Sequence, residues 1–260
     1  EIPARVDKTH TSSVSGGLRV YRRAETQQVT ASRMEFERVK LEAVPLLGVA
    51  FATEEILTDS IVSFIALLQA GFRDEFNSKL VEERLRGVGG GQFEGVMNSP
   101  AKIEISKESG QKADTITYGN LIAMRSRCWG YQNAVWMANQ DCLPQLMQIV
   151  LPIGTAGVAM WQMNAREGEP DTLLGRPIIY SEHCSTVGDA GDLILVNWSQ
   201  YLEGTYERSG SAESMHVRFE NHERAFKFWM RNAGAGWWKT ALTPKRGASL
   251  SPFIMLAERT

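Results

Sequence analysis

Residues 58–91 read TDSIVSFIALLQAGFRDEFNSKLVEERLRGVGGG, and they hold the longest helical pattern in the chain. Their apolar side chains recur every three or four positions, which places them on one side of an α-helix. We therefore predict one long helix over residues 58–86, with a well-buried first half. The expected core face of this helix consists of Ile61, Ile65, Leu68, Phe72 and Phe76.

The ends and the middle of this helix carry their own signals. Thr58, Asp59 and Ser60 can each cap an N-terminus, because a side-chain oxygen can accept from free amides of the first turn. Gly87 and the glycines after it predict the C-terminal end. Gly71 lies inside the helix, where glycine costs about 1 kcal/mol relative to alanine. We expect either close packing or a bend there.

The composition is that of an ordinary globular protein. The 260 residues are 43% hydrophobic and 22% charged, enough for one large domain or two small ones. The formal net charge of -2 argues against sequence-specific binding to duplex DNA. No apolar run reaches the roughly eighteen residues of a membrane span, so no membrane partner is expected. Cys128, Cys142 and Cys184 are odd in number and widely spaced, which predicts free thiols in a reducing compartment.

The N-terminal segment predicts an arm followed by a long hairpin. Residues 1–17 are polar and lack periodicity, as in an extended arm. Residues 18–44 alternate roughly between apolar and charged side chains, as in two paired strands. A hairpin of this kind is marginal alone in water, so it either covers its own domain or contacts a partner. Its charged residues include Arg19, Arg22, Arg23, Glu25, Glu35, Glu37 and Arg38.

The remainder predicts a mixed α+β fold. Residues 46–57 read as a buried strand that leads into the long helix, and residues 102–106 as a short strand. Residues 117–200 alternate short helices and strands, as in a compact α/β lobe. A hairpin turn is expected at Ser209–Ser211. Four apolar or alternating runs after residue 214 predict further β-strands.

A search for chemistry finds no catalytic cluster. The acid pairs Glu54–Glu55 and Glu82–Glu83 lie at helix edges, where acids are usually solvated. The glycines of residues 87–91 follow a helix and lack the lysine of a phosphate loop. Cys128 and His183 could form a nucleophile and its base, but nothing in the sequence positions them together. We therefore expect a structural, interface-making protein, not an enzyme, with no cofactor and no metal site.

The order of several motifs resembles one protein family. The chain carries TAS-x-M-x-F-x-x-V-x-L at 30–41, TEEILTDS at 53–60, LLGRPIIYSEH at 173–183, GDLILVNWSQY at 191–201 and AFKFWMRNAGAGWW at 225–238. Together with the polar arm, the hairpin and the long helix, this order resembles the major capsid protein of tailed double-stranded DNA phages, which has the Hong Kong 97 fold. The resemblance covers nearly the whole chain.

This resemblance implies a division of the chain into named parts. The N-terminal arm is expected at 1–17 and an extended hairpin, the E-loop, at 18–44. A peripheral domain is expected at 45–116 and contains a spine helix at 58–86. The axial domain is expected at 117–215, the returning strands of the peripheral domain at 216–245, and the last axial strand at 246–260.

The same resemblance implies a function and a set of partners. Copies of the chain are expected to form hexamers and pentamers that close into an icosahedral shell, the virion capsid, assembled in the cytoplasm of a bacterial host. The expected partners are non-specifically packaged double-stranded DNA, and possible scaffolding segment, protease, portal and decoration proteins. Proteolytic maturation in the family fits Glu1 as a processed start. The charged E-loop residues are then candidates for contacts between subunits.

Some family members form a lysine–asparagine cross-link between subunits, assisted by a glutamate. No lysine lies between Leu18 and Val39, and no acid lies between Glu223 and Glu258. We therefore expect no autocatalytic cross-link. Two other functions stay open at this level. One is an encapsulin-type shell that encloses cargo enzymes, and the other is a hydrolase or transferase that uses Cys128 or His183.

Overall fold

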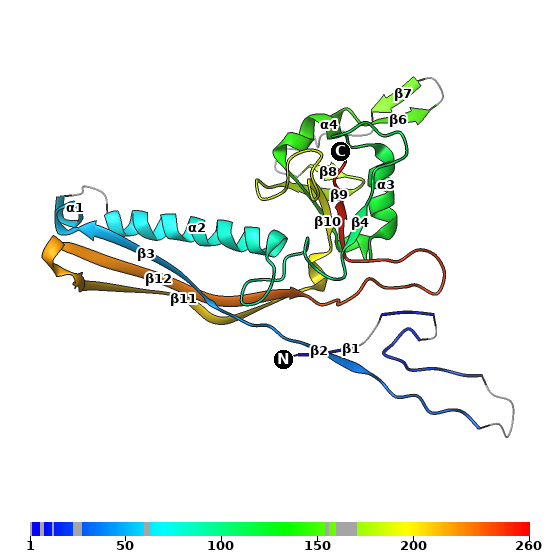
Figure 1. Cartoon of the computed structure of the whole chain (residues 1–260), viewed down its shortest axis with the longest axis horizontal. Helices are drawn as coiled ribbons and strands as arrows, with labels where there is room; N and C mark the ends of the chain where they lie inside the picture. The colour runs from blue at the N-terminus through cyan, green and yellow to red at the C-terminus, as the bar shows by residue number, and fades with distance from the viewer. Residues whose placement is uncertain are drawn as a thin grey trace. The chain divides into compact units, whose positions relative to one another are not determined.

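The chain divides into two compact units, each built around its own β-sheet (Figure 1). The computed structural model describes residues 2–5, 8–11, 13–22, 28–59, 63–153, 156–159 and 171–260. Unit 1 comprises Glu1–Lys40, Val96–Leu202 and Gly236–Thr260, and unit 2 comprises Leu41–Gly95 and Glu203–Ala235. The α+β class expected from the sequence is confirmed.

Unit 1 contains a six-stranded mixed sheet. Its strands, in spatial order, are β4 (Ile103–Ile105), β13 (Phe253–Leu256), β10 (Leu193–Val196), β5 (Val135–Ala138), β9 (Arg176–Tyr180) and β8 (Thr172–Leu173). The pairs β4–β13 and β5–β9 are parallel, and the other neighbours are antiparallel. Every residue of β10 and β13 is buried, as expected for central strands covered on both faces.

Short helices cover this sheet. They are α3 (Tyr118–Arg127), α4 (Leu143–Met147) and the 3₁₀ turns η1 (Tyr131–Asn133), η2 (Gln140–Cys142) and η3 (Trp198–Gln200). Thr117 and Asn120 form a reciprocal capping box at the start of α3. Asn139 caps η2, and its side chain accepts a hydrogen bond from the amide of Asp141 at 3.1 Å. Trp136, Leu121 and Leu146 are fully buried in the core between these elements.

The N-terminal hairpin differs from the prediction. Strand β2 (Phe36–Val39) pairs with β1 (Ile2–Arg5), not with residues 18–22. Residues 18–22 and 28–35 contain no strand, and the amide of Arg19 donates to Ser32 Oγ between these two segments at 3.0 Å. Val39 is completely buried where β2 pairs with β1. Most side chains of residues 18–22 and 28–35 are exposed, so strand pairing between these segments would bury too little apolar area to offset the entropy lost on ordering them.

A two-stranded antiparallel hairpin follows α4. Strand β6 (Val150–Ile153) pairs with β7 (Ala156–Ala159) three residues after the helix ends at Met147.

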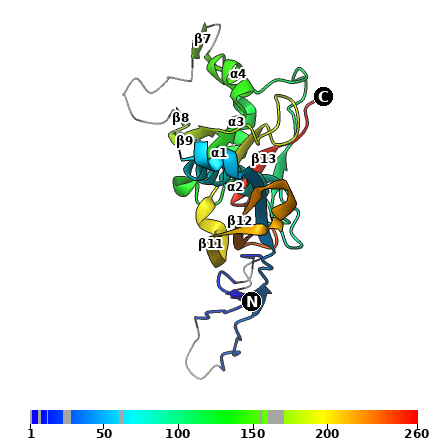
Figure 2. The ribbon, with the colours of Figure 1, turned by 90° about the vertical axis from the view of Figure 1, so that its left-hand side faces the viewer.

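Unit 2 contains a three-stranded antiparallel sheet with one long helix (Figures 1 and 2). Its strands are β11 (Tyr201–Arg218), β12 (Glu223–Gly236) and β3 (Pro45–Thr53), in that order. The helices are α1 (Glu54–Asp59) and α2 (Phe64–Arg86). The predicted turn at Ser209–Ser211 is wrong, because β11 runs through it and the chain turns at η4 (Phe219–Asn221). His222 ends that turn with φ +55°.

Helix α2 packs on the sheet through an aromatic side chain. The rings of Phe72 and Phe228 lie 4.7 Å apart between centroids. Gly48 of β3 faces the same ring, and a Cβ atom there would overlap it. The absence of a side chain at Gly48 therefore lets the helix approach β3 closely.

The predicted core face of α2 is partly wrong. Ile65 is 37% exposed, whereas Leu85 near the C-terminus is fully buried. Leu68, Phe72 and Phe76 are half-buried, and Ile61 lies outside the described residues. The second half is the better buried because the chain folds back after Gly87. That return places the buried Phe93 beside Arg84, with the guanidinium 5.8 Å from the ring centroid.

The predicted single helix is two helices. Helix α1 ends at Asp59 and α2 begins at Phe64, with residues 60–62 outside the described part. Thr58 does not cap α2, because its hydroxyl donates to the carbonyl of Glu54 within α1 at 2.8 Å. Helix α2 is continuous through Gly71, and a Cβ there would meet nothing within 4 Å. Close packing at Gly71 is therefore excluded.

The unit boundaries also lie elsewhere than expected. The sequence placed residues 45–116 in one domain, but β4 belongs to the unit 1 sheet because it pairs with β13. The sequence placed residues up to 215 in the axial domain, but unit 2 resumes at Glu203. A single extended strand, β11, crosses the expected boundary and therefore offers no place for a break there.

Candidate assembly surfaces

Only some of the charged E-loop residues lie in the described part of the chain. Arg19, Arg22 and Glu35 are exposed. Glu37 already pairs with Lys8 of its own chain at 3.4 Å. Arg38 is exposed and also has an interaction within the chain. Arg23 and Glu25 lie outside the described residues. A role of these residues in contacts between subunits stays a prediction.

The E-loop also exposes apolar side chains that sequence reasoning missed. Val20 is 99% exposed, and Leu18, Tyr21 and Val29 are exposed as well. Leu18 and Val20 alternate with arginines, as in a paired strand, but no described strand covers them. Exposed apolar groups on an extended segment indicate a protein partner.

A second apolar surface lies on the unit 2 sheet. Leu47, Val49 and Phe51 alternate along β3 and are all exposed, whereas Gly48 between them faces α2. Because side chains alternate between the faces of a strand, these three lie on the face away from α2. We call this surface the outer sheet face. In register, Trp229 lies opposite Leu47 and Lys227 opposite Val49.

Cations lie over the aromatic rings of the same sheet. The Arg218 guanidinium carbon lies 4.1 Å from the Phe51 ring centroid, and Lys227 Nζ lies 5.3 Å from that of Trp229. The guanidinium carbon of Arg231 lies 5.7 Å from the ring centroid of Tyr206. Strand β3 is also an edge strand in the described sheet. Its outer face combines apolar area, cations and an open edge, which suits an extended protein segment.

The two parts of the chain differ in charge. Residues 1–40 hold eight Lys or Arg and five Asp or Glu, a net charge of +3. Unit 2 holds nine Lys or Arg and fourteen Asp or Glu, a net charge of -5. Within unit 2 some acids are neutralised locally, since Glu54 accepts from Arg224 at 3.0 and 3.2 Å. Residues 1–40 and unit 2 of another copy are therefore complementary in charge.

The thiols are poor candidates for catalysis. Burial raises the pKa of Cys128 to about 12. Burial, followed by the charge of Asp192, raises the pKa of Cys142 to about 12. A nucleophilic cysteine needs the opposite shift, toward the thiolate. Cys184 is also buried, and none of the three cysteines forms a disulfide, as the sequence predicted. The geometry gives the Cys128 and His183 hypothesis no support.

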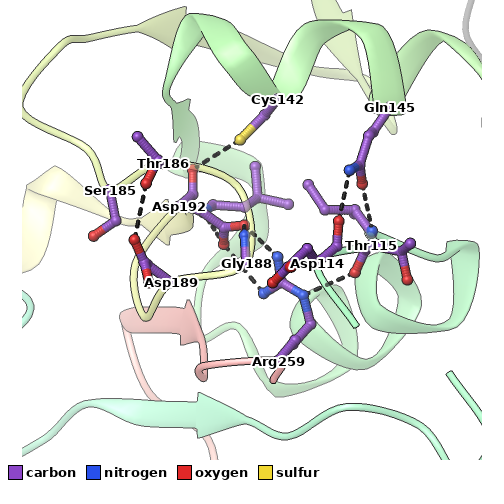
Figure 3. A network of polar contacts seen from close by, with 12 residues as sticks. Asp114, Thr115, Cys142, Gln145, Ser185, Thr186, Gly188, Asp189, Asp192 and Arg259 are labelled. Carbon is purple, nitrogen blue, oxygen red and sulfur yellow. Dashed lines mark hydrogen bonds and ion pairs between the residues drawn. The ribbon is translucent and has the colours of Figure 1, made fainter. Parts of the chain in front are cut away.

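A buried ion pair organises one end of unit 1 (Figure 3). Arg259 and Asp192 are both fully buried, and two guanidinium nitrogens reach the two carboxylate oxygens. Asp192 also accepts from the amides of Gly188 at 3.0 Å and Leu193 at 2.8 Å. Cys142 Sγ contacts the carbonyl of Asp192 at 3.6 Å. Every carboxylate oxygen thus has partners, as a structural pair requires. Neither residue stands out in the sequence, since both are ordinary charged positions in the pattern.

The described ranges contain no cluster of three or more His, Cys, Asp and Glu side chains arranged to hold a metal ion. Among the same residues, no helix has the length and hydropathy to span a membrane.

The sequence of the chain is similar to known capsid proteins. The profile of the phage capsid family matches residues 5–242. The capsid polyprotein of Pseudomonas phage PAJU2 is 27% identical over 224 residues, which cover 82% of this chain. The chain spans 32% of the length of that polyprotein.

Solved structures show the same fold. The capsid of an empty GTA particle superimposes with a TM-score of 0.74 at 14% identity, covering 100% of this chain and 85% of that one. A structure from Mycobacterium phage Bobi gives 0.66 at 12% identity, covering 98% and 84%. The holo-SrpI encapsulin complex of Synechococcus elongatus gives 0.55 at 11% identity, covering 87% and 77%. The encapsulin match is weaker than the two others.

The fold is therefore that of the Hong Kong 97-like capsid proteins. With a family profile that matches most of its length and two surfaces suited to protein contact, the chain belongs to the phage capsid family.

Proposed function

We propose that this chain is the major shell subunit of a tailed phage or prophage, and that its copies form hexamers and pentamers of an icosahedral capsid around double-stranded DNA. The observation that carries the proposal is the match of the phage capsid family over residues 5–242. In family terms, unit 2 corresponds to the peripheral domain, the sheet of unit 1 to the axial domain and α2 to the spine helix.

The principal contact between copies is proposed to join the E-loop of one copy to the outer sheet face of another. Val20 and Tyr21 present apolar area on the first, and Leu47, Val49 and Phe51 present it on the second. The net charges of +3 on residues 1–40 and -5 on unit 2 as a whole favour the encounter of the two parts, and individual charged side chains set the register of the contact. Such a contact is modest in one pair of copies, but repetition over a closed shell makes the assembly stable.

The charged residues of the E-loop, Arg19, Arg22, Arg23, Glu25 and Glu35, are proposed to set this register. Glu37 and Arg38 contribute less, because both have interactions in their own chain. Packaged DNA is proposed to interact non-specifically, since the chain has no net positive charge. Scaffolding, protease, portal and decoration proteins, and assembly in the host cytoplasm, are proposed from the family alone.

The test compares two substitutions in the E-loop that add the same charge. Val20→Asp removes an exposed apolar group, whereas Thr30→Asp replaces an exposed polar one. We expect Thr30→Asp to form shells visible by electron microscopy. We expect Val20→Asp to stay as subunits or small oligomers with an unchanged circular dichroism spectrum.

Shells from both variants would contradict the E-loop contact but not the capsid function. Failure of the unmodified chain to form any closed particle under all assembly conditions would contradict the function itself. The contents of purified particles separate the phage shell from the encapsulin alternative, since the first encloses DNA and the second encloses cargo protein.

A further inference from the structure

The C-terminal residues 257–260 cross the end of the unit 1 sheet after β13 and hold two separate loops. The first loop, residues 106–117, joins β4 to α3, and the second, residues 181–192, joins β9 to β10. We call residues 257–260 the strap. Figure 3 shows Arg259 reaching from the strap to Asp192 and to the carbonyl of Thr115.

Backbone hydrogen bonds tie the strap to both loops. Toward the first loop, the amide of Asp114 donates to the carbonyl of Arg259 at 2.9 Å. Toward the second loop, the amide of Arg259 donates to the carbonyl of Gly188 at 2.8 Å. The side chain of Arg259 also contacts both loops. Its Nε donates to the carbonyl of Thr115 at 2.8 Å, and its terminal nitrogens donate to the carboxylate of Asp192. One residue therefore bridges two loops that have no strand in common.

The loops also touch each other beneath the strap. Gly188 has φ +98°, and a Cβ there would overlap the carboxylate of Asp114. From α4, Gln145 Nε2 donates to the carbonyl of Asp114 at 2.6 Å, and Gln145 Oε1 accepts from the amide of Ile116 at 2.8 Å. The first loop is thus fixed from one side by α4 and from the other by the strap.

Because Asp192 is buried and charged, the second loop stays ordered only while the strap is docked and supplies the neutralising cation. With the strap removed, Asp192 keeps the amides of Gly188 and Leu193 but loses the cation that neutralises it. A fully buried carboxylate without a cation is strongly unfavourable, so the second loop must open to admit water. Loss of the contacts at Asp114 and Thr115 frees the first loop at the same time.

We propose that the strap and both loops form one cooperative opening unit, closed by the Arg259–Asp192 pair, which opens while the rest of the unit 1 sheet stays folded. This conformational device belongs to the single subunit and does not depend on shell assembly. The surface that residues 106–117 and 181–192 present to any neighbour exists only while the strap is docked.

The first test is native-state hydrogen exchange of the unmodified chain at low denaturant concentrations, read by mass spectrometry. We expect amides of the strap, of 106–117 and of 181–192 to share one opening free energy, below that of β5 and β10. Separate opening free energies for the two loops would overturn the proposal, and so would a common value for the loops and the central strands.

The second test uses variants of the full chain. Arg259→Met should raise exchange at least tenfold in both loops and leave β11 and β12 of unit 2 unchanged. The double variant Asp192→Asn with Arg259→Met should exchange more slowly than Arg259→Met alone, because it removes the uncompensated charge. Arg246→Met, at an exposed arginine of the same unit, is the matched control and should leave exchange unchanged.

Faster exchange in the strap alone would show a passive tail and would contradict the proposal. Equal acceleration across the whole of unit 1 would show a general core defect and would contradict it as well. If Arg259→Met does not fold, the exchange pattern of the unmodified chain still decides the question.

Discussion

At the scale of single residues, two glycines of unit 2 have opposite roles. Gly48 makes room for the ring of Phe72, whereas Gly71 has open space around it. We predict that Gly48→Ala lowers the free energy of unfolding by about 1–3 kcal/mol, because the added methyl displaces that ring. Gly71→Ala should raise it by about 0.5–1 kcal/mol through helix propensity. Urea denaturation of both variants checks the pair, and equal effects would contradict the packing described for Gly48.

Buried thiols predict a loss of stability in alkali. The pKa of Cys128 and of Cys142 in the folded chain is about 12, against an ordinary 9.0 when unfolded. Between these values the folded state retains protons that the unfolded state releases, so rising pH favours unfolding. The stabilisation is complete below pH 9 and declines from pH 9 toward 12, by up to about 1.4 kcal/mol per pH unit for each group.

Unfolding free energies at pH 8, 9 and 10 measure this decline. Cys128→Ser should reduce the slope, since one of the two thiols is then gone. Burial also raises the pKa of Tyr180 to about 12, which adds the same trend above pH 10. A flat profile between pH 8 and 10 would contradict the burial of the thiols.

At the scale of elements, helix α2 is asymmetric along its length. Leu85 is fully buried near its C-terminal end, whereas Leu67 near its N-terminal end is 64% exposed. We predict that Leu85→Ala lowers the free energy of unfolding by about 2–5 kcal/mol, through lost burial and the cavity left behind. Leu67→Ala should change it by less than about 0.5 kcal/mol in the isolated subunit. Chemical denaturation compares them, and similar losses would place the core along the whole helix.

At the scale of the whole molecule, charge should control assembly. Arg19→Glu with Arg22→Glu removes the positive excess of residues 1–40, which we propose faces the negative unit 2 of a neighbour. We predict that this variant folds but does not form shells, as judged by circular dichroism and electron microscopy. Lys245→Glu with Arg246→Glu makes the same charge change at exposed positions outside the proposed contact and should assemble.

Ionic strength provides a second measurement of the same contact. Exposed ion pairs weaken as salt rises, so light scattering should show slower assembly of the unmodified chain at higher salt. A rate that does not depend on salt, together with normal shells from the Arg19 and Arg22 variant, would place the charges outside the interface.

Particular elements show which features of the fold the sequence pattern can predict and which it cannot. The strands at 193–196 and 253–256 and the helix at 118–127 were predictable, because their apolar runs and caps are local signals. The pairing of β2 with β1 was not, since a strand pattern does not name its partner. The two halves of α2 have similar apolar spacing, and only the return of the chain at Phe93 distinguishes them.

The candidate surfaces show the same limit. The sequence pointed to the charged E-loop, because charges are visible one residue at a time. The outer sheet face was missed, since Leu47, Val49 and Phe51 look like core residues until the sheet is seen to lack a covering layer on that side. The Arg259–Asp192 pair joins residues 67 positions apart, and no local pattern marks either of them.

The sequence by itself determined the α+β class, the long helix, the free thiols and, through the order of its motifs, the family. These follow from periodicity, composition and the order of motifs, which are all written along the chain. Only the tertiary structure decided which half of α2 is buried, where the two units divide and which charge neutralises Asp192. Burial and pairing depend on segments that are distant in sequence, and their contacts exist only once the chain has folded.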